Sequence, residues 1–334
     1  MSKGNIAAAV LEGSGLGAVL RRVPAWRGLL IVNHHRVGDG TRWTTGRDVW
    51  SATAEQLDAQ MAFLSRNFEL VGPDELCDAV GALRGRRVAV TFDDGYRECH
   101  DVALPILRSH GVRAVFFLTT GFIDGTRGAW WDEITWMVSR SGRPSIPADG
   151  WLPAPVPIDG PRRDPGILRL HAYYKTLDGD RAEGFLDYLA GVTGSGRRGP
   201  ASTREEWLSW DMVREMRQAG MGFGGHSVNH PVLARQSPER QLAEIGGSLG
   251  RIEQELHERP RLFSYPEGTR GAFDATTKAA LRECEVRLAF TNHGGILGDR
   301  PSDPYEVPRI GMDRTMPATR FRAITALPRH LARQ

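Results

Sequence analysis

The sequence predicts an α/β fold with a parallel sheet, because apolar runs of strand length alternate with amphipathic helical segments along most of the chain. Residues 28–32 and 114–118 are apolar runs that end at polar residues, as buried strands do. Leu57, Met61 and Leu64 share one face of an expected helix between them. This alternation is typical of a parallel sheet covered by helices. The 40% hydrophobic content of the 334 residues suffices for a globular core.

The expected elements follow one another in a regular order. An amphipathic segment near residues 5–22 precedes the strand at 28–32, and helices are expected from Thr53 and from about Pro73. The later expected elements are strand 87–90, helix 99–109, strand 114–118, helix 207–219, strand 221–225, helix 238–257, strand 261–265, helix 273–283, strand 287–291 and a final strand at 305–310.

The alternation breaks between about 141 and 199, where Pro, Gly and Arg are frequent and one helical stretch spans 167–190. We interpret this region as an insertion that either shapes one wall of a groove or is a spacer without substrate contact. The expected organisation is an N-terminal helical segment (1–27), a main domain (28–312) that carries the insertion, and a C-terminal tail (313–334).

Composition argues against several classes of function. The chain has 43 Lys and Arg against 40 Asp and Glu, and no basic run with interleaved aromatics, so a nucleic-acid partner is not expected. No apolar run approaches the ~20 residues of a transmembrane helix. Cys77, Cys99 and Cys284 are widely spaced, which argues against a disulfide scaffold and fits a reducing compartment. We therefore expect a cytoplasmic protein, whose oligomeric state the sequence does not indicate.

Two adjacent carboxylates follow the strand at 87–90, in the segment Thr91-Phe92-Asp93-Asp94-Gly95. Barrel and open-sheet enzymes hold their catalytic groups at such strand ends. Because neighbouring carboxylates repel each other, the pair indicates a bound cation or a coupled acid–base pair. The simpler interpretation is a turn after a strand, for which Asp and Gly are common residues.

Two imidazoles lie four residues apart in Gly224-Gly225-His226-Ser227-Val228-Asn229-His230-Pro231. Positions i and i+4 share a face of a helical turn, so both side chains can converge on one ion. A carboxylate from another strand end would complete two nitrogens and one oxygen, the ligand set of a catalytic zinc site with an open position. The alternative is a pair of packed or surface histidines.

The two motifs, Thr-Phe-Asp-Asp-Gly and His-Ser-Val-Asn-His, resemble the first two motifs of the polysaccharide deacetylases, carbohydrate esterase family 4, whose members share the NodB homology domain. The resemblance covers about residues 28–312 and implies a distorted (β/α)7 barrel. It also implies that Asp93 is the catalytic base and that Asp94, His226 and His230 hold a divalent metal, most simply Zn²⁺, with Co²⁺, Ni²⁺ or Mn²⁺ as alternatives. One carboxylate would bind the cation while the other takes a proton from water.

The general acid is expected upstream of these motifs. The sequence is similar to the permuted branch of the family that includes the biofilm poly-N-acetylglucosamine deacetylases, in which an early Tyr-His segment supplies the acid. Aligning Tyr-His-Arg-Val on His34-His35-Arg36-Val37 implies that His35 is the acid and that His34 replaces an aromatic residue. His293 is a competing acid, and both early histidines could also simply end a strand.

The third motif departs from the family pattern, because Ser264 and Glu267 stand where relatives have an arginine and an aromatic residue. The resemblance places Tyr265 and Glu267 at the substrate, and the backbone N–H of Glu267 is a candidate oxyanion donor. The same segment is also an ordinary turn after a strand. A charged side chain at 267 leaves the substrate class open.

Three further side chains are candidates for substrate binding. Trp131 would stack on a sugar and Asp132 would bind hydroxyl groups, unless both belong to the buried start of a helix. Arg309 would supply the positive charge that Ser264 lacks and would keep Asp93 ionised by pairing with it. The alternative is an ordinary surface arginine.

The sequence thus predicts a metal-dependent hydrolase that removes N-acetyl groups from an N-acetylated sugar, oligosaccharide or exopolysaccharide precursor. The first alternative is an O-acetyl carbohydrate esterase. The second is a non-catalytic carbohydrate-binding protein on the same barrel, which the replacements at Ser264 and Glu267 motivate. A cytoplasmic location would favour a precursor, a lipid-linked sugar or a small glycoside as substrate.

Overall fold

A curled parallel sheet forms the centre of the structure, a computed structural model that describes residues 3–22, 26–40, 49–81, 85–297 and 303–332. The strand order is β11-β10-β9-β6-β5-β1-β12, and β4 pairs with β5. The strands are β1 (Gly28–His34), β4 (Glu69–Leu70), β5 (Arg86–Phe92), β6 (Val115–Leu118), β9 (Gly222–Gly225), β10 (Leu262–Ser264), β11 (Leu288–Phe290) and β12 (Ile310–Gly311). Their pairings are all parallel, as the alternation of strands and helices predicts.

The last segment of the sheet joins its two edges. Val307 forms a parallel bridge to Phe290 of β11, and Ile310 pairs with Val32 of β1. The expected final strand at 305–310 is therefore shortened to β12 and one bridge. The sheet curls towards closure through this segment, which confirms the prediction of a distorted barrel of about seven strands.

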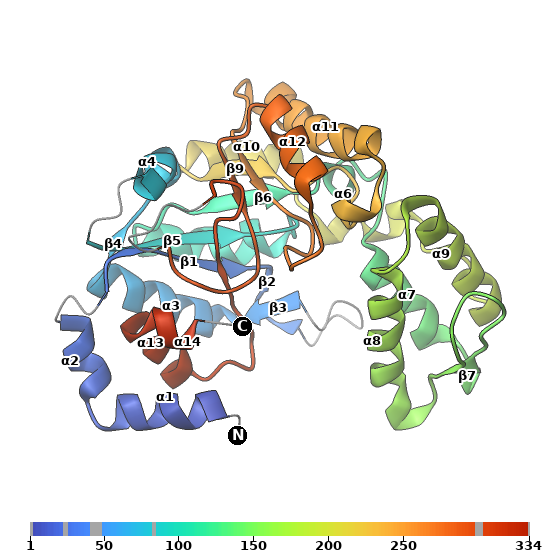
Figure 1. Ribbon diagram of the computed structural model, residues 1–334, viewed down its shortest axis with the longest axis horizontal. Coiled ribbons are helices and arrows are strands. Elements are labelled where there is room, and N and C mark those ends of the chain that lie inside the picture. The colour runs from blue at the N-terminus through green and yellow to red at the C-terminus, as the bar shows by residue number, and fades with distance from the viewer. Residues whose placement is uncertain (1–2, 23–25, 41–48, 82–84, 298–302, 333–334) are drawn as a thin grey trace.

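Helices cover the outside of the sheet (Figure 1). They are α3 (Ala54–Asn67), α4 (Leu76–Gly81), α5 (Leu104–Ser109), α10 (Trp210–Gln218), α11 (Pro238–Leu256) and α12 (Ala275–Glu283). A capping box of Thr53 and Gln56 begins α3. The expected helix 99–109 begins instead as a π-helical turn, in which the Leu104 N–H bonds to the Cys99 carbonyl. Pro105 follows at once and has no N–H to donate, so an α-helical ladder cannot run through this point.

A second hydrophobic core lies beside the barrel, in a lobe built from α7 (Trp130–Arg140), α8 (Arg163–Tyr174) and α9 (Gly179–Thr193). A short hairpin of β7 (Ser145–Ile146) and β8 (Val156–Pro157) completes it. The lobe contains the expected insertion, but its core also includes α7, which precedes residue 141. The single helical stretch expected at 167–190 is in fact two helices, because Asp178 adopts an extended conformation as the N-cap of α9.

The N- and C-terminal helices pack together at one corner of the barrel (Figure 1). They are α1 (Lys3–Gly13), α2 (Leu16–Arg22), α13 (Ala318–Ala326) and α14 (Pro328–Leu331). The Trp26 indole donates a hydrogen bond of 2.8 Å to the Thr325 carbonyl and ties this corner to the first strand. Among the described residues, no helix is long and apolar enough to cross a bilayer.

Candidate active site and metal centre

Strained turns gather around the C-terminal ends of the strands. Seven non-glycine residues of the described chain have positive φ, and four of them lie here: Asp94 (74°), Ser227 (65°), His230 (56°) and Glu267 (64°). Such conformations cost free energy and persist only where the surroundings impose them. They turn the side chains of three different strand ends towards one space.

Asp94, His226 and His230 meet at this point. Their potential ligand atoms all lie within 4.8 Å of one another, and all three residues are buried. Oδ1 of Asp94 is 3.2 Å from Nε2 of His226 and 3.4 Å from Nε2 of His230, and it accepts no hydrogen bond. A buried carboxylate oxygen that faces two imidazole nitrogens in this way fits the ligand set of a divalent cation. The structure therefore brings together the three residues that the two motifs single out.

A backbone carbonyl fixes the orientation of His226. Its Nδ1–H donates to the Ser264 carbonyl at 2.7 Å, which leaves Nε2 directed at Asp94. The loop that carries the histidines is held by Glu244 of α11, which accepts the N–H groups of Val228 and Asn229 at 2.9 and 2.8 Å. Glu244 is not among the residues predicted from the sequence, because nothing near it in the chain marks it as a partner of this loop.

Burial and ion pairing act against each other on Asp94. Burial alone would raise the pKa of this carboxyl group, but the facing imidazoles of His226 and His230 hold the pKa well below its usual value. The carboxylate of Asp94 thus stays ionised in a buried site, which a cation would stabilise further. The ring of His230 is in turn held by packing against Trp131, with 4.7 Å between the ring centroids.

Asp93 has a separate set of partners. Arg309 donates two hydrogen bonds to its carboxylate, at 2.8 and 2.7 Å, and both residues are fully buried. Asn33 and Ser264 add hydrogen bonds of 2.9 and 3.2 Å. Burial would raise the pKa of Asp93, but the charge and hydrogen bonds of Arg309, together with the nearby imidazoles of His226 and His35, outweigh burial and hold the pKa below its ordinary value. The structure shows the pairing expected for Arg309, whereas Asn33 was missed.

The two early histidines lie in different environments. His35 lines the cleft described below, and its Nε2 is 4.0 Å from Oδ2 of Asp93. His34 is buried against Phe92, and desolvation lowers its pKa to about 4. His293 does not line the cleft, and its ring lies 6.4 Å from that of Phe273. Of the competing acids, only His35 is brought next to Asp93.

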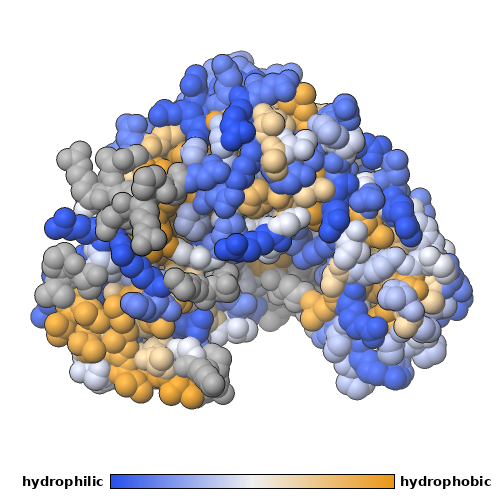
Figure 2. All heavy atoms as spheres, viewed as in Figure 1, coloured by the Kyte–Doolittle hydropathy of each residue, from blue (hydrophilic) through white to orange (hydrophobic). Residues whose placement is uncertain are grey.

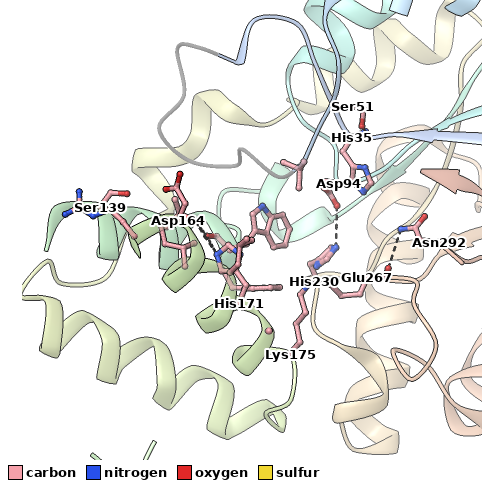
Figure 3. A pocket seen from close by; sticks show the side chains of 18 of the residues that line it. His35, Ser51, Asp94, Ser139, Asp164, His171, Lys175, His230, Glu267 and Asn292 are labelled. Carbon is pink, nitrogen blue, oxygen red and sulfur yellow. Dashed lines mark hydrogen bonds and ion pairs between the residues drawn. The ribbon is translucent and has the colours of Figure 1, made fainter. Parts of the chain in front are cut away.

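A cleft of about 880 Å³ opens in front of these groups, between the barrel and the lobe (Figure 3). The barrel contributes the metal-site residues and His35, and the lobe contributes His171 and Lys175. Nζ of Lys175 forms an ion pair of 2.6 Å with Glu267 on the opposite wall. Trp131 and Glu267, two of the expected substrate contacts, line this cleft.

The other expected substrate contacts do not line the cleft. Tyr265 is fully buried, and its hydroxyl donates to the Tyr305 carbonyl at 2.9 Å. Asp132 is 1% exposed, and burial together with nearby Glu206 raises its pKa to about 7. Arg309 lies beneath Asp93. The structure therefore does not place Tyr265, Asp132 or Arg309 where a sugar in the cleft would contact them.

Comparison with known protein families identifies the family of the chain. The sequence model of the polysaccharide deacetylases matches residues 81–143 and 187–289. The chain belongs to the polysaccharide deacetylase family. The part of the chain between the two matched stretches, residues 144–186, falls within the lobe.

Individual relatives of the chain are distant. It is 23% identical over 116 residues to YxkH of Bacillus subtilis (strain 168), provisionally named a polysaccharide deacetylase; the match spans 35% of this chain and 40% of YxkH. The PplD deacetylase of Streptococcus pyogenes, solved with acetate, has a TM-score of 0.55 at 18% identity and covers 86% of this chain and 93% of its own. IcaB from Ammonifex degensii has a TM-score of 0.55 at 19% identity, with 90% and 96% covered. At such identities these structures show a shared fold.

Proposed function

We propose that the protein is a metal-dependent hydrolase that removes N-acetyl groups from an N-acetylated saccharide. The observation that carries the proposal is the placement of two adjacent carboxylates in two different settings. Asp94 faces His226 and His230, while Asp93 is paired with Arg309 and has His35 beside it. Membership of the polysaccharide deacetylase family supports a carbohydrate substrate.

Asp94, His226 and His230 would hold the metal, and the two nitrogens and one oxygen favour Zn²⁺. Co²⁺, Ni²⁺ and Mn²⁺ accept the same kinds of ligand. A bound cation would supply Lewis acidity, which polarises the acetyl carbonyl and makes a water more acidic.

Asp93 is proposed as the general base that accepts the proton of the attacking water. Its lowered pKa keeps it ionised at neutral pH, so it is ready to accept this proton. Arg309 and Asn33 hold the carboxylate in one orientation, which reduces the motion that must be lost before reaction. The backbone N–H of Glu267, in a strained turn on the cleft wall, is the candidate donor to the developing oxyanion.

His35 is proposed as the acid that protonates the leaving amine. An amide nitrogen cannot leave as an anion, so cleavage of an N-acetyl group needs a proton donor on the cleft side. His35 meets this need because its side chain is 24% exposed and its Nε2 lies 4.0 Å from the base. The sugar oxygen of an O-acetyl ester departs more readily as an alkoxide than an amide nitrogen departs as an anion. The presence of an acid beside the base therefore favours the amide substrate over an O-acetyl ester.

Release of acetate is the direct test. We expect acetate from N-acetylhexosamine oligomers, its loss after chelation and its return when Zn²⁺ is added. Release from O-acetylated sugars alone would identify an esterase instead. A protein that binds the metal and the oligomers but releases no acetate from either substrate would be a carbohydrate-binding protein.

A further inference from the structure

Exposed apolar side chains are concentrated on α1 and α2. Five large hydrophobic residues of the described chain are exposed, and four of them lie on these two helices: Ile6 (52%), Val10 (66%), Leu16 (50%) and Val19 (54%). Figure 2 shows the apolar surface that results, on a protruding corner of the molecule. Single exposed apolar residues are ordinary, but a contiguous patch is typical of an interaction surface.

The two helices are anchored through their other faces. Ala8 and Gly17 are buried, and both helices pack against α13. Arg21 forms an ion pair of 2.7 Å with Glu12 and donates a hydrogen bond to the Arg322 carbonyl. The inner faces of α1 and α2 are thus already packed against α13. The exposed apolar side chains form the outer surface of two helices that are held in place.

The helices that form and support this patch are rich in basic residues. The sequences of α1, α2, α13 and α14 contain six Lys and Arg but only one acidic residue, Glu12, which is paired with Arg21. The chain as a whole is nearly balanced, with 43 basic and 40 acidic residues. Arg22 and Arg322 are exposed at this corner. An apolar centre with a cationic rim is complementary to an anionic lipid surface.

We propose that the corner formed by α1 and α2 docks onto an anionic membrane surface. Ile6, Val10, Leu16 and Val19 would enter the interface between headgroups and acyl chains, while Arg22 and the cations of α13 face the headgroups. A second copy of the chain fits less well, because a two-fold contact through this patch would bring two cationic rims together.

Docking would bring the cleft close to the lipid. In Figure 2 the hollow between the barrel and the lobe lies on the same lower edge as the apolar corner. A saccharide carried on a lipid would then be presented beside the cleft entrance. This consequence rests on the proposed function, whereas the docking itself does not.

Co-sedimentation of the full chain with lipid vesicles tests the docking. We expect the protein to sediment with phosphatidylcholine vesicles that contain phosphatidylglycerol and to remain largely in solution with phosphatidylcholine alone. The double variants Ile6→Ser/Val10→Ser and Leu16→Ser/Val19→Ser should each bind roughly tenfold or more weakly, because each removes two inserted side chains. Arg22→Glu/Arg322→Glu should lose binding by a similar factor.

Leu168→Ser is the matched control, since it removes another exposed apolar side chain, 52% exposed, from α8 instead of the corner. It should sediment as the wild type does. Melting curves establish that the corner variants are folded, so vesicle binding can be read whether or not acetate is released. The inference is overturned if the wild type sediments with neither kind of vesicle. A concentration-dependent dimer that the corner variants abolish would equally overturn it, because the patch would then be a contact between two copies.

Discussion

The carboxylate of Asp93 accepts two hydrogen bonds from Arg309, whereas that of Asp94, one residue later, faces the imidazole nitrogens of His226 and His230. The left-handed conformation of Asp94 separates the two side chains and gives each its own partners. Two like charges can therefore coexist in a buried site, because each is stabilised by a different group. The proposed division of roles between base and ligand follows from this separation.

Replacing Arg309 with Met should move the acid limb of the pH–rate profile. With Arg309 present, the pKa of Asp93 lies below the usual ~4, so the base is ionised throughout the neutral range. Without it, burial raises this pKa, and kcat/KM should begin to fall at a higher pH. Breaking a buried ion pair costs ~3–5 kcal/mol of stability, so the milder variant Arg309→Lys is measured beside Arg309→Met. An acid limb that is unchanged in both variants would contradict the assignment of Asp93 as the base.

Asp132 should make the fold less stable as the pH rises. Its pKa is about 7 in the folded protein and ~3.9 when unfolded, so the folded state binds more protons between these values and stability decreases from pH 4 to pH 7. Asp132→Asn removes this dependence. The variant should match the wild type near pH 4 and exceed it by up to ~4 kcal/mol above pH 7. Thermal melts at both pH values check this, and an equal difference at each would refute it.

At the scale of elements, α8 brings the lobe to the catalytic cleft. Lys175 follows the last turn of this helix and pairs with Glu267, the residue that replaces a common aromatic of the third motif. The charged side chain at 267 thus has a partner that comes from the insertion. The insertion forms one wall of the cleft, as one of its two sequence-based interpretations holds.

Lys175→Ala should raise KM several-fold and change kcat little, because Lys175 lines the cleft without reaching the proposed base or metal ligands. Lys278→Ala is the control: it removes a lysine that forms ion pairs with Asp303, at 2.8 Å, and with Glu306, both outside the cleft. Steady-state kinetics on the same oligosaccharide separate the two. Equal effects of both variants would show that Lys175 only stabilises the fold.

Most elements could be predicted from sequence because their signals are local. Thr53 and the periodic Leu57, Met61 and Leu64 are enough to indicate α3. The metal-site residues sit in two contiguous motifs, and Arg309 could be inferred because Ser264 left a charge missing. Asn33 and Glu244 could not, because their contacts are fixed by the three-dimensional arrangement of distant segments and have no local pattern.

At the scale of the whole molecule, the barrel and the lobe flank one cleft, and the proposed ligands come from two strand ends of the barrel. Metal binding should therefore stabilise the folded barrel, since the unfolded chain does not hold these residues together. Removal of metal with a chelator should lower the melting temperature by several degrees, and Zn²⁺ should restore it. The melting temperature of His226→Ala should respond to neither treatment. If the melting temperature of the wild type also stayed the same after chelation and after addition of Zn²⁺, this would argue against a metal site.

Metal content measured together with turnover is the decisive test of the proposed metal site and base. Elemental analysis of purified Asp93→Asn should find the same metal content as in the wild type, while acetate release falls by about 10²–10⁴ because the base is lost. His226→Ala should lose both metal and activity. If His226→Ala kept the full metal content, the cation would not be held by Asp94, His226 and His230, and the proposed mechanism would be wrong.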